Sequence, residues 1–173
     1  YLVTDMIGTN KCFWPERLGR LLNNKGKGIT KNYRQSDEFK WIYDISNSTS
    51  EGEHIYKRME IDNIINNAKI YTDESINSKL DKMEYLHAID TSDSRDILNW
   101  DEIKEMLSSG FVRFGSHTRR HTRLTSAISH KNLEDEIEGS KKILEDKLNI
   151  PVTTFCFPNG DYTQKVKNMV QST

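Results

Sequence analysis

Residues 111–121 read FVRFGSHTRRH, an apolar stretch that leads into a turn with two histidines. Residues 111–114 predict a strand that ends just before the first histidine. His117 and His121 are four residues apart, so their imidazoles can converge on one metal ion from a short turn or helix. Neutral imidazole suits zinc and its first-row neighbours. Three protein ligands and an open position would make such a site catalytic, so a third ligand would be needed.

This spacing has a second interpretation. Histidines four residues apart also occur on ordinary helix surfaces, where they only form hydrogen bonds with their surroundings. The position of His117, just past the predicted end of a strand, favours metal binding, because the functional groups of α/β folds gather there. On spacing and position alone, both interpretations stay open.

The flanking residues predict helices. Asn99 can cap a helix, with Glu102 three residues later as in a capping box, and Gly110 ends it. Ser129 caps a long helix, which ends before Pro151 because proline cannot continue it. One face of this long helix carries Leu133, Ile137, Ser140, Leu144 and Leu148.

A second strand is predicted at residues 153–157, and the turn at 158–161 leads into a final helix that Asp161 can cap. The order is then helix, strand, helix, strand, helix. Such alternation predicts an α/β fold in which crossover helices connect parallel strands, either in a barrel or in an open sheet.

Residues 30–95 are polar and rich in Asn, Asp, Ser and Lys. The helix before them begins at Trp14-Pro15 and is expected to end near Gly26 or Gly28. Two apolar stripes inside the stretch predict two helices: Ile61, Ile64, Ile65 and Ala68 form one, and Ile76, Leu80, Met83 and His87 form the other. We interpret the stretch as a helical insertion or lid. Its aromatic residues form either a partner surface or, as we favour, anchors for the inserted helices; they are Trp41, Tyr43 and Tyr56.

The composition narrows the class of protein. A chain of 173 residues, 35% hydrophobic and 29% charged, suits one soluble globular domain. The formal net charge of −1 predicts no attraction to nucleic acid or to an anionic membrane, and no apolar run reaches the length of a bilayer span. Cys12 and Cys156 form neither a disulfide framework nor a C-x-x-C pair, so the compartment stays open between envelope, secreted and cytoplasmic locations.

Both ends of the sequence resemble the interior of a domain. Residues 1–5 predict the end of a buried strand, and residues 166–171 predict a helix with an apolar stripe and no terminal cap. Domains rarely begin or end inside packed elements. We therefore expect a fragment that lacks segments on both sides.

A second candidate site is the turn Pro158-Asn159-Gly160. A strand that ends in such a turn can expose a backbone N–H, and a backbone N–H can stabilise an oxyanion during acyl transfer. Taken alone, an ordinary strand-to-helix turn is the favoured interpretation. Cys156 alternates with two phenylalanines, which indicates a packed thiol and not a nucleophile.

Together these stretches resemble the polysaccharide deacetylases, the NodB-homology carbohydrate esterases. Residues 111–121 resemble their second motif, which reads His, then Ser or Thr, two variable residues, and His. Residues 157–160 are similar to their third motif, in which proline and an aromatic residue precede glycine. Residues 1–8 look like the strand after the first motif, and residues 98–106 fit the helix before the histidines. The resemblance covers residues 1–28 and 97–173.

The resemblance implies an incomplete deacetylase domain over residues 1–173, with the insertion at 30–95. The implied fold class is α/β, part of a distorted (β/α) barrel of the polysaccharide deacetylase type. The implied function is metal-dependent hydrolysis of acetyl groups on N-acetylated polysaccharides or oligosaccharides such as chitin, peptidoglycan or a related glycan. The expected partner is acetylated carbohydrate, with no nucleic acid and no membrane segment in this chain.

The resemblance also implies residue roles. His117 and His121 would bind zinc or another divalent first-row metal, and Thr118 would brace their loop. The metal would polarise the acetyl carbonyl and activate a water molecule, from which an aspartate takes the proton. The backbone N–H of Asn159 would contact the oxyanion, and Pro158 with Asn159 would contact the substrate.

Several residues depart from the family pattern. The family's two catalytic aspartates belong to a motif that would precede Tyr1, and Asp5 matches the following strand instead. Asn159 stands where an aromatic residue is usual, and Cys156 where arginine often opens the third motif. We therefore expect half an active site and an inactive fragment. The alternatives are a catalytically silent carbohydrate-binding relative, an O-acetyl esterase on xylan-like glycans, and a metal-free interaction domain.

Overall fold

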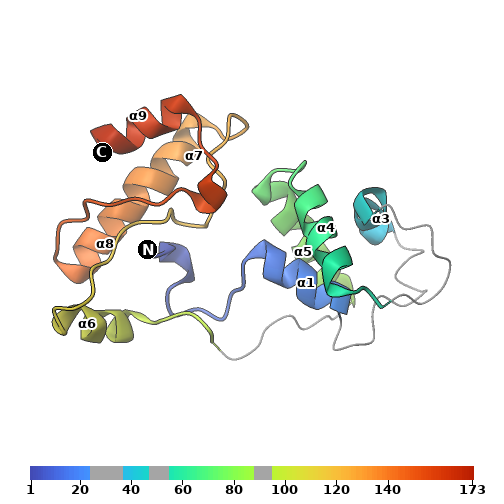
Figure 1. Cartoon of the computed structure of the whole chain (residues 1–173), viewed down its shortest axis with the longest axis horizontal. Coiled ribbons are helices and arrows are strands. Elements are labelled where there is room, and N and C mark those ends of the chain that lie inside the picture. Colours follow the sequence, from blue (N-terminus) through green and yellow to red (C-terminus); the bar gives the residue numbers. More distant parts are fainter. Residues whose placement is uncertain (24–36, 47–54, 88–94) are drawn as a thin grey trace. The chain divides into compact units, whose positions relative to one another are not determined.

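The computed structural model describes residues 1–23, 37–46, 55–87 and 95–173 (Figure 1). The chain divides into two compact units: unit 1 comprises residues 1–11 and 93–173, and unit 2 comprises residues 12–92. Both histidines of the predicted metal site belong to unit 1.

The described residues of unit 1 form short and medium helices. These are η1 (Thr4–Met6), α6 (Trp100–Ser108), α7 (His130–Glu134), η4 (Asp135–Gly139), α8 (Ser140–Leu148), η5 (Pro158–Gly160) and α9 (Gln164–Ser172). The described residues of unit 2 form α1 (Trp14–Asn23), η3 (Asp37–Phe39), α3 (Lys40–Ser46), α4 (Arg58–Ala68) and α5 (Asp73–His87). None of the described helices is both long and apolar enough to cross a membrane.

The predicted α/β fold with part of a (β/α) barrel is wrong. Within the described residues there is no sheet, and the extended segments pair only at isolated parallel bridges. These bridges join Leu2 to Ser116, Ser116 to Phe155, and Leu124 to Tyr162. The strands predicted at 111–114 and 153–157 are therefore absent as ladders.

The predicted strands form no ladders because each extended segment leaves its neighbour after a few residues. A ladder needs several successive residues in pairing distance. The first segment enters the helical turn η1 two residues after its bridge at Leu2, and the second meets a left-handed residue, Thr118 with φ 69°, two residues after Ser116. Phe111, at the start of the second predicted strand, is 95% exposed and packs on little. The apolar residues at 111–114 and 153–157 therefore predicted strand ladders, whereas the backbone forms only isolated bridges.

Three extended segments still run side by side around Ser116. On one side, Leu2 N–H donates to Gly115 O at 2.9 Å and His117 N–H donates to Leu2 O at 3.0 Å. On the other side, Ser116 N–H donates to Thr154 O at 2.9 Å and Cys156 N–H donates to Ser116 O at 2.9 Å. Because the segments are parallel, the residues that follow each bridge emerge at the same edge.

Gly115 allows this close approach. A Cβ atom at this position would overlap with Thr154 Oγ1 and would lie 2.8 Å from the Thr154 carbonyl oxygen. The carbonyl belongs to the backbone that Ser116 pairs with, so it cannot move away without breaking the pairing. Only glycine fits between the two segments.

We predict that Gly115→Ala lowers the free energy of unfolding by about 1–3 kcal/mol, the usual cost of overpacking. Urea unfolding followed by circular dichroism measures this change. Gly19→Ala is the matched control, because a Cβ there would make an ordinary contact of 3.8 Å with Ile61. It should be neutral or slightly stabilising, since alanine has the higher helix propensity. Equal stability of Gly115→Ala and the wild type would contradict the close approach.

The predicted capping box at the start of α6 is confirmed. Asn99 Oδ1 accepts from Glu102 N–H at 2.9 Å, and Glu102 Oε2 accepts from Asn99 N–H at 2.7 Å. The guanidinium of Arg95 also donates to Glu102, and these hydrogen bonds with that from Asn99 lower the pKa of Glu102 to about 2. Gly110 follows the helix with φ 76°, as its predicted role as terminator requires.

The predicted long helix begins at its expected cap but is not uniform. Ser129 Oγ accepts from Asn132 N–H at 3.3 Å. The helix then passes through α7, the π-helical turn η4 and α8, which Figure 1 shows as one run. Its predicted inner face is buried: Leu133, Ile137, Ser140, Leu144 and Leu148. The cap predicted for the last helix is wrong, because Thr163 and not Asp161 caps α9, accepting from Val166 N–H at 3.3 Å.

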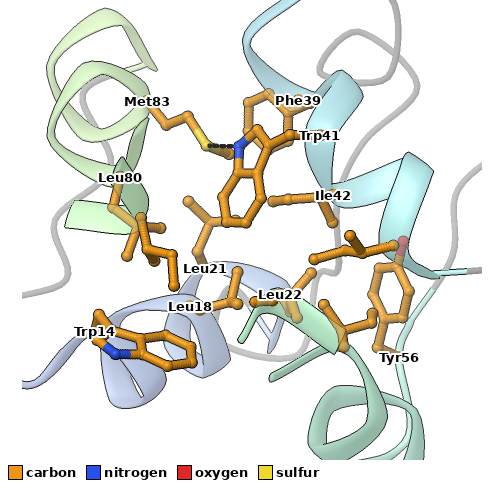
Figure 2. Packing of buried hydrophobic residues seen from close by; sticks show 14 residues of the cluster. Trp14, Leu18, Leu21, Leu22, Phe39, Trp41, Ile42, Tyr56, Leu80 and Met83 are labelled. Atoms are coloured by element: carbon orange, nitrogen blue, oxygen red, sulfur yellow. Dashed lines mark hydrogen bonds between the residues drawn. The ribbon is translucent and has the colours of Figure 1, made fainter. Parts of the chain in front are cut away.

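Unit 2 has a helical core of its own (Figure 2). The two helices predicted from apolar stripes are confirmed as α4 and α5, whereas α3 was not predicted. Trp41 and Tyr56 are buried, so they anchor helices, as favoured above; Trp41 Nε1 donates to Met83 Sδ at 3.4 Å. Helix α1 begins at Trp14 as predicted, while the expected ends at Gly26 or Gly28 lie outside the described residues.

Candidate functional site

The turn after Ser116, residues 117–121, brings the two predicted histidines together. We call it the histidine turn. The ring centroids of His117 and His121 lie 4.8 Å apart, with an angle of 71° between the ring planes. His117 comes directly after the residue that pairs with both neighbouring segments. The pair therefore stands at the edge where the extended segments end.

A backbone carbonyl orients the first of these imidazoles. His117 Nδ1 lies 2.8 Å from the carbonyl oxygen of Cys156. A carbonyl oxygen can only accept a hydrogen bond, so Nδ1 carries the hydrogen and the neutral ring has its lone pair on Nε2. Histidines that bind metals are usually oriented in this way, with the second ring nitrogen donating to a carbonyl or carboxylate.

The backbone of the turn is strained at both ends. Thr118 and His121 have φ of 69° and 63°, a left-handed conformation that costs a residue other than glycine about 1–3 kcal/mol. Thr118 is fully buried, and its hydroxyl accepts from His121 N–H at 2.9 Å. Its carbonyl accepts from Thr4 N–H at 3.2 Å. Thr118 thus ties the end of the turn to its start and to the N-terminal segment.

Two arginines between the histidines form an ionic network. Arg119 pairs with Asp5, at 3.1 Å from Nε to Oδ1, and with Asp135. Arg120 pairs with Asp135 at 2.7 Å and with Glu136 at 2.8 Å. Burial alone would raise the pKa of Asp135, but the hydrogen bonds from the two guanidinium groups lower it below its usual value. The carboxylate of Asp5 is thus paired with an arginine in this network.

The turn η5 begins two residues after Cys156, whose carbonyl orients His117. Asn159 and Gly160 both have positive φ, 55° and 73°. The hydrogen bonds of the turn come from Gly160 N–H to Phe157 O and from Asp161 N–H to Pro158 O, at 2.9 and 3.0 Å. Neither uses the N–H of Asn159, which is an exposed residue, whereas Pro158 is buried.

Sequence reasoning missed two features beside these turns. Tyr162 stacks on Phe157 with centroids 4.4 Å apart and is 48% exposed, so part of its ring faces solvent. Glu136 is 1% exposed and contacts the histidine turn. The sequence does contain a signal for Tyr162, which is an aromatic residue just after the glycine turn. It contains none for Glu136, which resembles its acidic neighbours.

The pair His117 and His121 is the candidate metal site among the described residues. Among them, no group of three or more His, Cys, Asp and Glu side chains comes close enough to hold a metal ion. The imidazole pair itself fits a metal, because its rings are adjacent and His117 has its Nε2 lone pair available. To hold a divalent ion, such a pair would need further ligands from elsewhere.

The family model described as polysaccharide deacetylase matches residues 66–173. The chain belongs to the polysaccharide deacetylase family, and the resemblance drawn from the motifs is confirmed. Membership supports a deacetylase-type hydrolase that acts on carbohydrate, in a family that is generally metal-dependent. No curated protein matches the chain.

Proposed function

We propose that this protein is a metal-dependent hydrolase that removes acetyl groups from an N-acetylated polysaccharide or oligosaccharide, such as chitin, peptidoglycan or a related glycan. The family supports the deacetylase reaction in general. The observation that carries the finer proposal is the adjacent pair of imidazoles, one of them oriented by a carbonyl so that Nε2 can bind a metal.

In this proposal His117 and His121 bind zinc or another divalent first-row metal. The resemblance to the family implies aspartates as the third ligand and the general base; within the described residues no third His, Cys, Asp or Glu side chain completes the site. When bound, such a metal polarises the acetyl carbonyl and lowers the pKa of its water ligand. Thr118 contributes by holding His121 in place, through the hydroxyl that accepts from its N–H.

The turn η5 is proposed to contact the substrate. Asn159 N–H would donate to the oxyanion that forms when water attacks the acetyl carbon, and Pro158 with Asn159 would border the acetylated sugar. The support is local: the turn follows the carbonyl that binds His117, and its own hydrogen bonds leave Asn159 N–H unused. The expected absence of a nucleic-acid partner stays a prediction.

A second candidate function is that of a carbohydrate-binding relative without catalysis. Cys156 favours it, because this residue stands where the family often has an arginine beside the general base. An O-acetyl esterase with the same metal site is the remaining alternative, and only the identity of the substrate separates it from an N-deacetylase.

We predict that His117→Ala and His121→Ala each weaken zinc binding by at least about 10-fold, because outer-shell partners alone often contribute that much. Titration of the chain with zinc, in competition with a chromophoric chelator, measures the affinity. His130→Ala is the matched control, since His130 is exposed and paired with Glu134 at 3.3 Å. Wild-type affinity in both histidine variants would refute the metal site.

We also predict that the protein expressed from its complete reading frame releases acetate from N-acetylated chitin oligosaccharides. The release should fall to background in His117→Ala, because one metal ligand is gone, and after chelation of the metal. Mass spectrometry of the sugar product shows whether an amide was cleaved. Acetate from acetylated xylan alone would indicate the esterase, and zinc binding without acetate from either substrate would indicate the silent relative.

A further inference from the structure

Glu136 is a buried acidic residue opposite the histidine turn. Its side chain is 1% exposed, and it belongs to the π-helical turn η4 between α7 and α8. A carboxylate in such a position is tolerated only when hydrogen bonds replace its lost hydration. Its partners therefore show what it does in the fold.

All the hydrogen bonds of this carboxylate come from residues in the histidine turn or just after it. Oε2 accepts from the backbone N–H groups of Arg119 and Arg120 at 2.9 and 3.0 Å. Oε1 accepts from Arg120 Nε at 2.8 Å and from Thr122 Oγ1 at 2.9 Å. The first two donors lie between the histidines and the last comes just after His121, so Glu136 holds the turn on both sides of that ligand.

The helix is shaped for this contact. A π-helical turn places one extra residue in a helix, and such turns are frequent at functional sites. In η4 it presents Asp135 and Glu136 together to the arginines of the turn. Gly139 leaves room for them, because a Cβ atom there would lie 3.2 Å from both Arg119 Cδ and Asp135 Oδ1.

We infer that Glu136 is a positioning residue, which fixes the backbone of the 117–121 turn so that both imidazoles face one metal ion. This inference rests on the proposed function for its link to metal binding. The hydrogen bonds themselves do not depend on it. Glu136 itself does not serve as a metal ligand, since its oxygens accept hydrogen bonds from residues 119, 120 and 122.

Glu136→Gln is the sharpest variant because it keeps the shape of the side chain. An amide offers one acceptor oxygen where the carboxylate offers two. In one orientation its NH₂ group would face Arg120 Nε–H, and in the other it would face the N–H groups of Arg119 and Arg120. Only the Thr122 hydroxyl can rotate to accept. At least one donor of the turn therefore loses its partner.

The test compares Glu136→Gln with Glu138→Gln, the control at an exposed position of the same helical turn. Zinc affinity should fall about 10- to 100-fold in Glu136→Gln, as for other outer-shell partners of metal ligands, and stay unchanged in the control. Amide hydrogen exchange by NMR is the second readout. The N–H groups of Arg119 and Arg120 should exchange at least about 10-fold faster in Glu136→Gln alone, since the exposed control does not reach them.

Wild-type zinc affinity in Glu136→Gln would overturn the link to the metal ligands, and unchanged amide exchange would overturn the positioning role itself. If the wild-type chain binds no zinc, the proposed metal site fails, while amide exchange still decides whether Glu136 holds the turn. If circular dichroism shows that Glu136→Gln does not fold, Glu136→Asp replaces it with the same criteria. The shorter carboxylate keeps the charge but cannot reach all of its donors.

Discussion

Ser116 pairs with two chain segments at once, and this pairing fixes the start of the turn that carries His117 and His121. Its backbone N–H and carbonyl bond to the 154–156 segment, while the peptides on either side of it bond to Leu2. Its hydroxyl lies 2.6 Å from that of Ser140, which donates in turn to the carbonyl of Ile137, so the same residue is also tied to helix α8. Because these hydrogen bonds hold Ser116 in place, they also fix the position at which the histidine turn begins. Gly115 makes the close approach sterically allowed.

The chemistry proposed for the site follows from how that turn is held. Two of its residues adopt left-handed backbone conformations, which persist only where surrounding groups determine them. Thr118 supplies a hydroxyl from inside the turn, and Glu136 supplies a carboxylate from the helix that Ser116 also contacts. The Cys156 carbonyl then selects the ring nitrogen of His117 that remains for a metal. The Cys156 carbonyl, the Thr118 hydroxyl and the Glu136 carboxylate thus all help to hold His117 and His121 in place.

Local features could be predicted from the sequence, and features that depend on distant partners could not. The capping box of Asn99 and Glu102 spans three residues, so its signal is complete within the sequence. The proximity of His117 and His121 likewise needs one turn only. Strand pairing, by contrast, depends on how long each segment runs beside its neighbour, and the left-handed residue at 118 ends that run early. Glu136 contacts residues 14 to 17 positions away, and burial alone distinguishes it from the acidic residues beside it. The cap of the last helix was predicted at Asp161 but lies at Thr163. Threonine and aspartate both cap helices well, so the residue type alone does not show at which of the two the helix begins.

Zinc K-edge X-ray absorption of the zinc-loaded chain, compared with its His121→Ala variant, shows whether His117 and His121 bind one metal ion together. Imidazole ligands give distinctive outer-shell scattering, so the spectrum counts the histidines bound to the metal. We expect two imidazoles bound to zinc in the wild type and one in the variant. The same number of imidazoles in both, or none in the wild type, would contradict the assignment of His117 and His121 as a metal-binding pair.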